Sequence, residues 1–136
     1  MKPRFEILPA TGERTIRLRL SGDFDVGTMK RFLEDYKRVT QPFAGSPHLV
    51  LADFRGMNPT SPDVAAILGE TIEYSRAAGV VCCAHLSDDT ITQLQAARLG
   101  RKSSPHSDVT VDVASREEAE RLLEEVRARL DLAGAD

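Results

Sequence analysis

The stretch that most constrains the fold runs from Leu49 to Leu68 and reads LVLADFRGMNPTSPDVAAIL. An apolar run ends at Asp53, a turn-rich loop follows, and Ser61-Pro62-Asp63 has the composition of a helix start, with a capping hydroxyl, a proline whose missing N–H costs nothing, and an acid suited to the helix dipole. This order predicts a strand, a loop and a helix. Open α/β sheets place binding sites beyond the carboxyl ends of their strands, so we expect the functional site in this loop.

A hairpin is predicted before that stretch. A short strand ends at Pro9, residues 10–13 form a turn, and the run RTIRLRLSG alternates apolar and charged residues. Such alternation indicates a strand with one buried face, so Arg17 and Arg19 are expected to face water.

A first helix is predicted between Asp25, its N-cap, and Pro42, which stops it. Its apolar residues fall at helical spacing: Met29, Phe32, Leu33, Tyr36 and Val39. Gly79 has the position of a helix C′ residue after the second helix, and VVCCAHL then predicts another buried strand. The second helix turns a further apolar stripe inward: Val64, Ile67, Leu68, Thr71 and Ile72.

The last third of the chain predicts one more strand between two helices. Asp88 and Asp89 start a shorter helix that ends at Gly100, and a polar loop follows. Alternating valines over residues 109–113 indicate a short strand. Ser115 and Glu118 have capping-box spacing, and the final helix carries an apolar stripe: Ala119, Leu122, Leu123, Val126 and Leu130.

These elements predict a single α/β domain over residues 1–130 with a frayed tail at 131–136. The sheet is expected to be mixed, mostly parallel and five-stranded, with an N-terminal hairpin and four helices. A chain of 136 residues is long enough for one packed domain and short for two.

Charge and composition exclude several partners. The net charge is -3, with basic and acidic residues interspersed, so no nucleic acid is expected. No apolar run reaches the ~20 residues of a membrane helix, and the N-terminus lacks the apolar core of a signal peptide, so no stable membrane insertion and a cytoplasmic location are expected. Cys82 and Cys83 are adjacent in a strand, so they point to opposite faces and stay reduced.

No catalytic or metal-binding constellation is recognisable. The three histidines, His48, His85 and His106, fall in separate elements without the spacing of metal ligands. His85, at the end of an apolar strand, is predicted to be half-buried with its ring nitrogens hydrogen-bonded. The candidate acids, bases and nucleophiles do not come together at one catalytic site. We therefore expect no enzyme activity, no metal and no cofactor.

Three places in the chain resemble the STAS domain, the sulfate transporter and anti-sigma factor antagonist family. They are the turn Leu20-Ser21-Gly22-Asp23-Phe24-Asp25, the strand LVLADF with its capped helix, and the unit 79–99 with Ser87 after its strand. The resemblance covers about Arg14 to Leu130. It implies a non-enzymatic module that binds a regulatory protein (an anti-sigma factor, a kinase or another STAS-type domain) and allows a homodimer.

The resemblance also implies a phosphorylated serine at the start of the second helix. Counted without gaps from Asp53, the Asp-Ser pair of the family falls on Ser61 and Pro62, and Pro62 has no hydroxyl. The switch is therefore degenerate. A one-residue shift in the loop makes Ser61 the acceptor with Thr60 before it, and Asp63 is a third source of negative charge; helix capping alone also explains Ser61.

The partner-binding surface implied by the site and the resemblance comprises Asp23, Asp25, Asp53, Asn58, Thr60, Ser61, Asp63, Val64 and Ser87. These residues belong to the turns after three strands and to the start of the second helix. A phosphate on Ser61 or Thr60 would add roughly -1.5 to -2 charge at the centre of this surface.

Two alternatives stay open. In a receiver-like domain Asp53 is phosphorylated, Asp23 and Asp25 hold a metal, and Ser87 is the switch hydroxyl; the hairpin and the absence of a lysine after the last strand speak against it. In a small-ligand or lipid-binding module, the pocket between helices and sheet is lined by Ile67, Tyr74 and Ile91.

Overall fold

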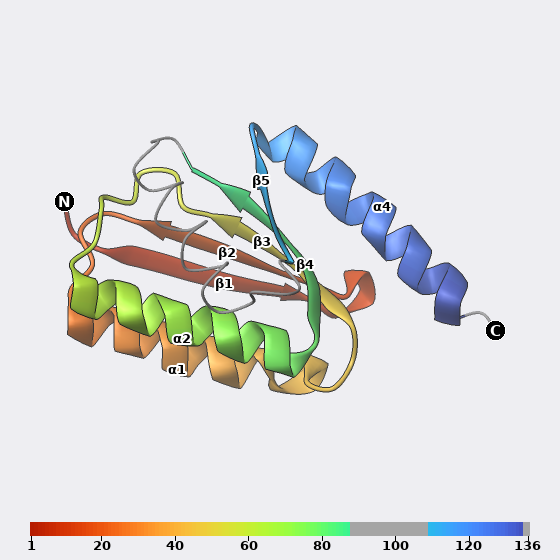
Figure 1. Cartoon of the computed structure of the whole chain (residues 1–136), viewed down its shortest axis with the longest axis horizontal. Helices are drawn as coiled ribbons and strands as arrows, with labels where there is room; N and C mark the ends of the chain where they lie inside the picture. The colour runs from red at the N-terminus through yellow and green to blue at the C-terminus, as the bar shows by residue number, and fades with distance from the viewer. Residues whose placement is uncertain (88–108, 135–136) are drawn as a thin grey trace.

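The computed structural model describes residues 1–87 and 109–134, and its strands form one sheet in the order β1-β2-β3-β4-β5 (Figure 1). The first pair is antiparallel and the other three pairs are parallel. This confirms the predicted α/β class, the mixed sheet and the N-terminal hairpin. The strands are β1 (Arg4–Ala10), β2 (Thr15–Ser21), β3 (His48–Asp53), β4 (Val80–Leu86) and β5 (Thr110–Val113), and η1 (Thr11–Glu13) joins the first two.

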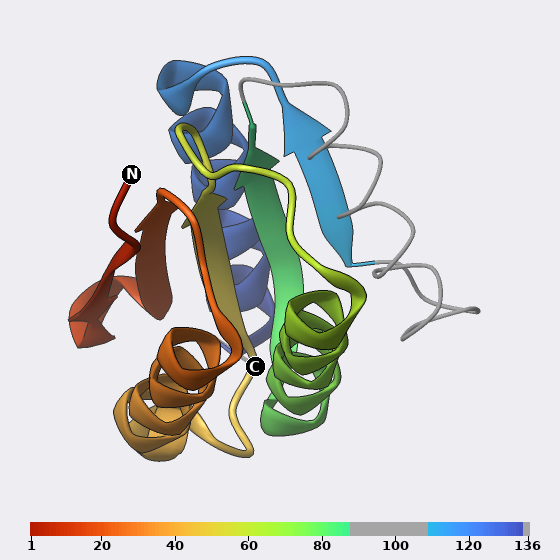
Figure 2. The same cartoon turned by 90° about the vertical axis from the view of Figure 1, so that its left-hand side faces the viewer.

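Helices cover both faces of the sheet (Figure 2). The helices α1 (Val26–Thr40) and α2 (Pro62–Ala78) lie side by side on one face, and α4 (Arg116–Gly134) lies on the other. Because the strand order advances in one direction, crossovers of a single hand place α1 and α2 on the same face. A short η2 (Gln41–Phe43) follows α1.

The described residues contain three of the four predicted helices. The predicted helix from Asp88 to Gly100 and the loop after it lie outside the described residues. The last helix continues to Gly134, beyond the predicted domain end at residue 130. Among the described residues, no helix combines the length and the apolar character that a membrane crossing requires.

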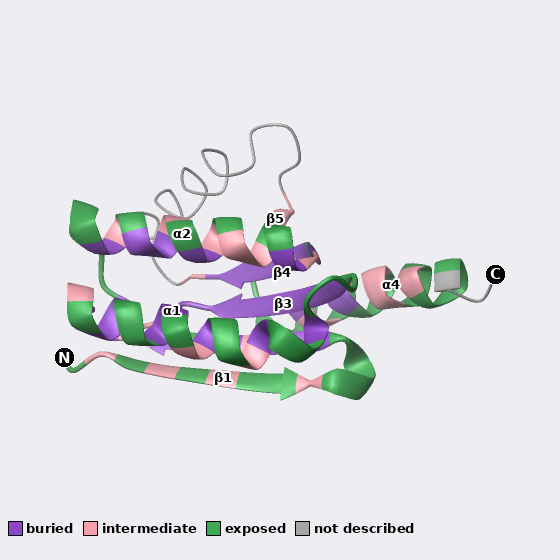
Figure 3. Ribbon diagram, turned by 90° about the horizontal axis from the view of Figure 1, so that it is seen from below, coloured by how far each residue is buried: buried purple, intermediate pink, exposed green. Residues whose placement is uncertain are grey.

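The sheet separates two apolar cores. The larger one lies between the sheet and α1 with α2, and the smaller one lies under α4. All six residues of β3 are buried, as its continuous apolar run predicts, whereas β1 is an edge strand with exposed residues (Figure 3). Cys82 packs into the smaller core and Cys83 against the larger one, so the two lie on opposite faces of the sheet, and no disulfide joins them.

The helix ends lie where capping residues in the sequence predict them. The side chain of Asp25 accepts a hydrogen bond from the Thr28 N–H at 2.7 Å and so caps α1. Gly79 ends α2 with a φ of 113°, and a Cβ there would lie 2.5 Å from the Ser46 carbonyl oxygen. Both the backbone conformation and the close approach therefore require glycine.

The predicted exposure of Arg17 is wrong. Its guanidinium donates to both carboxylate oxygens of Glu120 on α4, at 3.0 and 2.8 Å, and pairs with Glu13 at 2.8 Å. Packing of α4 against this face covers Arg17, whereas Arg19 stays exposed. Glu120 is thus part of a contact between helix and sheet rather than of a solvated helix face, and the pKa of its carboxyl is lowered chiefly by the hydrogen bond from Arg17.

Candidate functional site

The carboxyl ends of β2, β3 and β4 meet at one edge of the sheet. Arg19 of β2 pairs with Asp53 of β3, and Asp53 pairs with Leu86 of β4. The turn after β2, the loop after β3 and Ser87 after β4 therefore leave the sheet side by side, next to the N-terminus and the first turns of α1 and α2 (Figure 1). We refer to the turn 21–25, the loop 54–61 and residues 62–63 and 87 as the carboxyl edge.

Backbone hydrogen bonds join two loops of the carboxyl edge. The Gly22 N–H donates to the Gly56 carbonyl at 2.9 Å, and the Asn58 N–H donates to the Gly22 carbonyl at 3.1 Å, which forms a parallel bridge between Gly22 and Met57. Gly22 has a φ of 89°, and the Lys2 backbone occupies the space that a Cβ would need. Only glycine fits this junction.

Asp23 is the polar centre of the exposed part of the edge. Its carboxylate accepts a hydrogen bond from the Met1 ammonium at 2.7 Å and another from the Asn58 side-chain amide. These two bonds, the ammonium first, lower the pKa of Asp23, so its carboxylate remains charged. The side chain is 59% exposed, which leaves it accessible to a partner.

Asp53 lies beneath the loop rather than on its surface. Its side chain is 5% exposed, and Arg55 donates to it from Nε at 2.9 Å, from Nη2 at 2.8 Å and from the backbone N–H at 3.1 Å. Burial alone would raise the pKa of this carboxyl, but the hydrogen bonds from Arg55 outweigh burial and hold the pKa below its usual value. The carboxylate orients the loop and is shielded from reagents.

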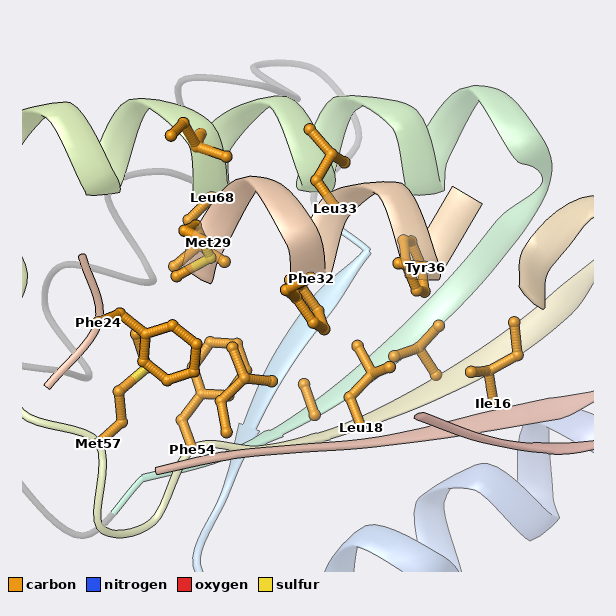
Figure 4. Packing of buried hydrophobic residues seen from close by; sticks show 14 of the residues in the cluster. Ile16, Leu18, Phe24, Met29, Phe32, Leu33, Tyr36, Phe54, Met57 and Leu68 are labelled. Atoms are coloured by element: carbon orange, nitrogen blue, oxygen red, sulfur yellow. The ribbon is translucent and has the colours of Figure 1, made fainter. Parts of the chain in front are cut away.

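An apolar base supports the exposed residues. Phe24, Phe54 and Met57 gather under the two loops (Figure 4), with 8%, 7% and 3% of their surfaces exposed. Val64, predicted as part of the partner-binding surface, is 1% exposed and belongs to the same core, because it faces the sheet from the first turn of α2. Asp53 and Val64 therefore shape the surface from below.

The start of α2 is exposed and capped. Ser61 accepts a hydrogen bond from the Val64 N–H at 3.4 Å, Pro62 occupies the first helical turn, and Asp63 is exposed beside it. Thr60 is half-buried. With Asp25 capping α1, two helices begin at the carboxyl edge, and their free N–H groups favour acceptors and negative charge.

The structure brings most of the predicted site residues to one edge: Asp23, Asp25, Asn58, Thr60, Ser61, Asp63 and Ser87. Sequence reasoning missed two contacts there. Arg55 falls in the predicted loop, but its pairing with Asp53 was not inferred, although a basic residue two positions after an acid at a strand end is a signal for it. The contact of Met1 with Asp23 has no local signal, because 22 residues separate the partners.

A cavity of about 60 Å³ lies between the sheet and α2, next to the carboxyl edge. Its described lining is predominantly apolar and includes Leu68 and Ile72 of α2, Phe32 of α1 and His85 of β4. Ile67 and Tyr74, predicted to line such a pocket, are not among the described lining residues, and Ile91 lies outside the described residues.

His85 is more buried than its sequence position suggests. The ring is 3% exposed, its Nδ1 lies 2.9 Å from the Asp112 carboxylate on β5, and Phe54 packs against it edge to face with ring centroids 5.0 Å apart. Its Nε2 has no hydrogen-bond partner among the described residues. Burial lowers the pKa of His85, and Asp112 and Asp53 offset only part of that effect.

No family model matches the chain, and no curated protein matches it. Within the described residues, no group of three or more His, Cys, Asp or Glu side chains is arranged to hold a metal ion. The geometry of the carboxyl edge and of the cavity beside it is therefore the basis for assigning a function.

Proposed function

We propose that this chain is a STAS-like, non-enzymatic regulatory module of the anti-sigma factor antagonist type, which binds another protein through its carboxyl edge. The observation that carries the proposal is the backbone junction at Gly22, which holds the turn after β2 and the loop after β3 as one surface. A surface that is ordered before binding loses less conformational entropy when a partner docks.

Charge gives this surface its specificity. Asp23, Asp25 and Asp63 are exposed, and the hydrogen bonds on Asp23 and Asp25 lower the pKa of both carboxyl groups. A partner with arginine or lysine side chains complements them. We propose an anti-sigma factor, a kinase or another STAS-type domain as that partner, including a second copy of this chain, in the cytoplasm.

A degenerate phosphoswitch is part of the proposal. Pro62, at the acceptor position counted from Asp53, cannot be phosphorylated, whereas the exposed hydroxyl of Ser61 can. A phosphate on Ser61 would lie at the start of α2, close to Asp63, on an already acidic surface. The added charge would strengthen binding of a basic partner and weaken binding of an acidic one.

Intact-mass measurement and peptide mapping on the protein recovered from its own cells test the switch. A phosphate on Ser61 or Thr60 supports it. Persistent absence of phosphate under signalling stress would mean that the docking module works without a switch.

Site-specific photocrosslinking in those cells tests docking itself. A benzophenone side chain replaces Asn58 or Asp63 in separate variants, and the matched control carries it in place of Arg38, a 74% exposed residue near the C-terminal end of α1. We expect a protein adduct from the first two positions and none from the control. Equal adducts at all three positions, or none at any, would contradict docking at the carboxyl edge.

The receiver-like alternative fits this geometry less well. It requires an accessible Asp53 with two further carboxylates beside it, whereas Arg55 covers Asp53 and hydrogen bonds engage Asp23 and Asp25. Labelling of Asp53 by acetyl phosphate would support the receiver-like alternative. The small-ligand alternative has one observation in its favour, the cavity under α2.

A further inference from the structure

We propose that the cavity under α2 is a binding site for a small, mostly apolar molecule with one hydroxyl group, which donates a hydrogen bond to Nε2 of His85. The cavity lies beneath the docking surface of the carboxyl edge rather than on it. The proposal also names the class of ligand that the small-ligand alternative requires. Three features of the described residues carry it: an unpaired buried nitrogen, its proton state, and the apolar wall beside it.

One ring nitrogen of His85 lacks a hydrogen-bond partner within the described part of the chain. Nε2 of His85 is buried and has no partner among the residues that the structure describes, although most buried polar atoms in native proteins are hydrogen-bonded. Leaving such an atom unpaired costs free energy, which a ligand group that pairs with it recovers. Each such group in a native protein needs an explanation, such as a functional role, a bound water or an ion.

The proton state decides which ligand group fits. A carboxylate can only accept, so Nδ1 of His85 carries the proton that it donates to Asp112 at 2.9 Å. In the neutral ring Nε2 is then an acceptor, and its partner must be a donor. Burial favours this neutral ring by lowering the pKa of His85.

The cavity wall decides the remainder of the ligand. Nε2 lies farther from the backbone than Nδ1, and the ring rises from the face of the sheet that α1 and α2 cover, so its tip enters the layer that holds the cavity. The lining around it is predominantly apolar: Phe32, Val50, Ala52, Phe54, Leu68 and Ile72. The hydroxyls of Thr71 and Ser75, which also line it, donate to backbone carbonyls of α2. A charged ligand would lose its hydration without compensation there.

The volume limits the size of the ligand. A cavity of about 60 Å³ corresponds to roughly four to six non-hydrogen atoms at about 10–15 Å³ for each water-sized unit. A short-chain alcohol has this size and carries the required donor. Phe54, which packs against His85, is also the first residue of the loop 54–61. An occupied cavity would therefore lie directly under the docking surface.

The test compares two probes of nearly equal shape, 1-butanol and 1-chlorobutane, by NMR titration of the whole chain labelled with ¹⁵N. We expect 1-butanol to bind roughly tenfold more tightly, because only the alcohol donates a hydrogen bond to Nε2. The Nε2 resonance of His85 should move during the alcohol titration. Equal affinity for the two probes, or no binding of either, would overturn the proposal.

His48 provides an internal control. It is also fully buried, its Nδ1 lies 2.8 Å from the Ser46 carbonyl, and its Nε2 is likewise unpaired among the described residues, but it does not line the cavity. Its resonances should stay unchanged. Equal movement of both histidine signals would indicate a general solvent effect and would also overturn the proposal.

A variant separates the hydroxyl contact from the cavity itself. His85→Phe keeps a ring of similar size and removes the acceptor, so it should abolish the preference for 1-butanol while 1-chlorobutane still binds. A preference that survives in a folded His85→Phe protein would contradict the proposed contact. Should this variant fail to fold, the probe comparison and the His48 control in the unmodified chain still decide the question.

Discussion

Arg55 closes over Asp53, with its Nε 2.9 Å from one carboxylate oxygen and its Nη2 2.8 Å from the other. The two residues are separated by one position, at the point where β3 becomes the loop of the carboxyl edge. The pair turns a buried negative charge into an anchor for the loop, because the Arg55 backbone N–H also donates to Asp53.

Removing the guanidinium should leave a buried carboxylate without its main partner. We expect Arg55→Met to lower the free energy of unfolding by about 1–3 kcal/mol at neutral pH, as for other buried hydrogen-bonded groups that lose a partner. The folded-state pKa of Asp53 is below its ordinary value of 3.8, so the pair stabilises the fold above that pH and its contribution is lost as pH falls through the folded pKa. Urea unfolding at neutral and acid pH measures both effects.

The matched control for this prediction is Arg19→Met, because Arg19 is exposed and its charge lowers the pKa of Asp53 less than the contacts from Arg55 do. It should change stability by less than about 0.5 kcal/mol. The double variant Asp53→Asn, Arg55→Met should recover part of the loss, since no buried charge remains. An Arg55→Met protein as stable as the parent would show that the pair does not anchor the loop.

Gly22 and Gly45 allow the backbone junction to be tested with one substitution at two sites. Both have a positive φ, 89° and 85°, but a Cβ at Gly22 meets the Lys2 backbone whereas a Cβ at Gly45 has nothing within 4 Å. Gly45→Ala should cost only the conformational strain, about 1–2 kcal/mol, and Gly22→Ala should cost about 1–3 kcal/mol more. Similar losses in urea unfolding would contradict the tight junction.

The two capped helices at the carboxyl edge should respond unequally to loss of the cap. Asp25 accepts from the Thr28 N–H at 2.7 Å, whereas Ser61 accepts from the Val64 N–H at 3.4 Å. We expect Asp25→Ala to lower the free energy of unfolding more than Ser61→Ala, which should cost about 0.5 kcal/mol, with Ser61→Asp close to neutral because aspartate also caps. Thermal or urea unfolding of the three variants measures this order, and a larger loss at Ser61 than at Asp25 would refute it.

Features that depend on neighbouring residues were predictable from the sequence. Local chemistry predicts the cap at Asp25, the start of α2 at Ser61-Pro62 and its end at Gly79. The apolar run of β3 predicts that the strand is buried on both faces. The loop of the carboxyl edge was also located, because it follows from strand direction.

Features that join distant residues were not predictable. Arg17 and Glu120 are 103 residues apart, and only the packing of α4 on the second face of the sheet brings them together. His85 and Asp112 meet because β4 and β5 pair in one particular register, which no pattern within either strand encodes. Asp53 and Val64 were assigned to the partner-binding surface, whereas Arg55 covers Asp53 and Val64 packs into the larger core. The inward apolar stripe predicted for the second helix already contained Val64.

The contact between Arg17 and Glu120 should contribute more than an ordinary surface ion pair. Arg17 has a side chain only 22% exposed and donates two hydrogen bonds to Glu120. A double-mutant cycle with Arg17→Met and Glu120→Gln should give a coupling of about 1 kcal/mol. The same kind of cycle on the exposed pair of Arg38 and Asp35 should give about 0.3 kcal/mol, and equal couplings would contradict the role assigned to α4 packing.

His85 should make the fold sensitive to mild acid. Its folded-state pKa lies below the ordinary value of 6.5 because the ring is buried, so the unfolded chain binds a proton before the folded chain does. The free energy of unfolding should therefore fall as pH is lowered from 6.5 towards the folded pKa and level off below it. His85→Gln removes this group, and the difference between parent and variant across about pH 7.5 to 4.5 isolates its contribution from those of the other titrating residues. A parent protein whose stability tracks that of His85→Gln at every pH would show that His85 titrates alike in both states, and the buried, neutral ring inferred for the cavity would then be excluded.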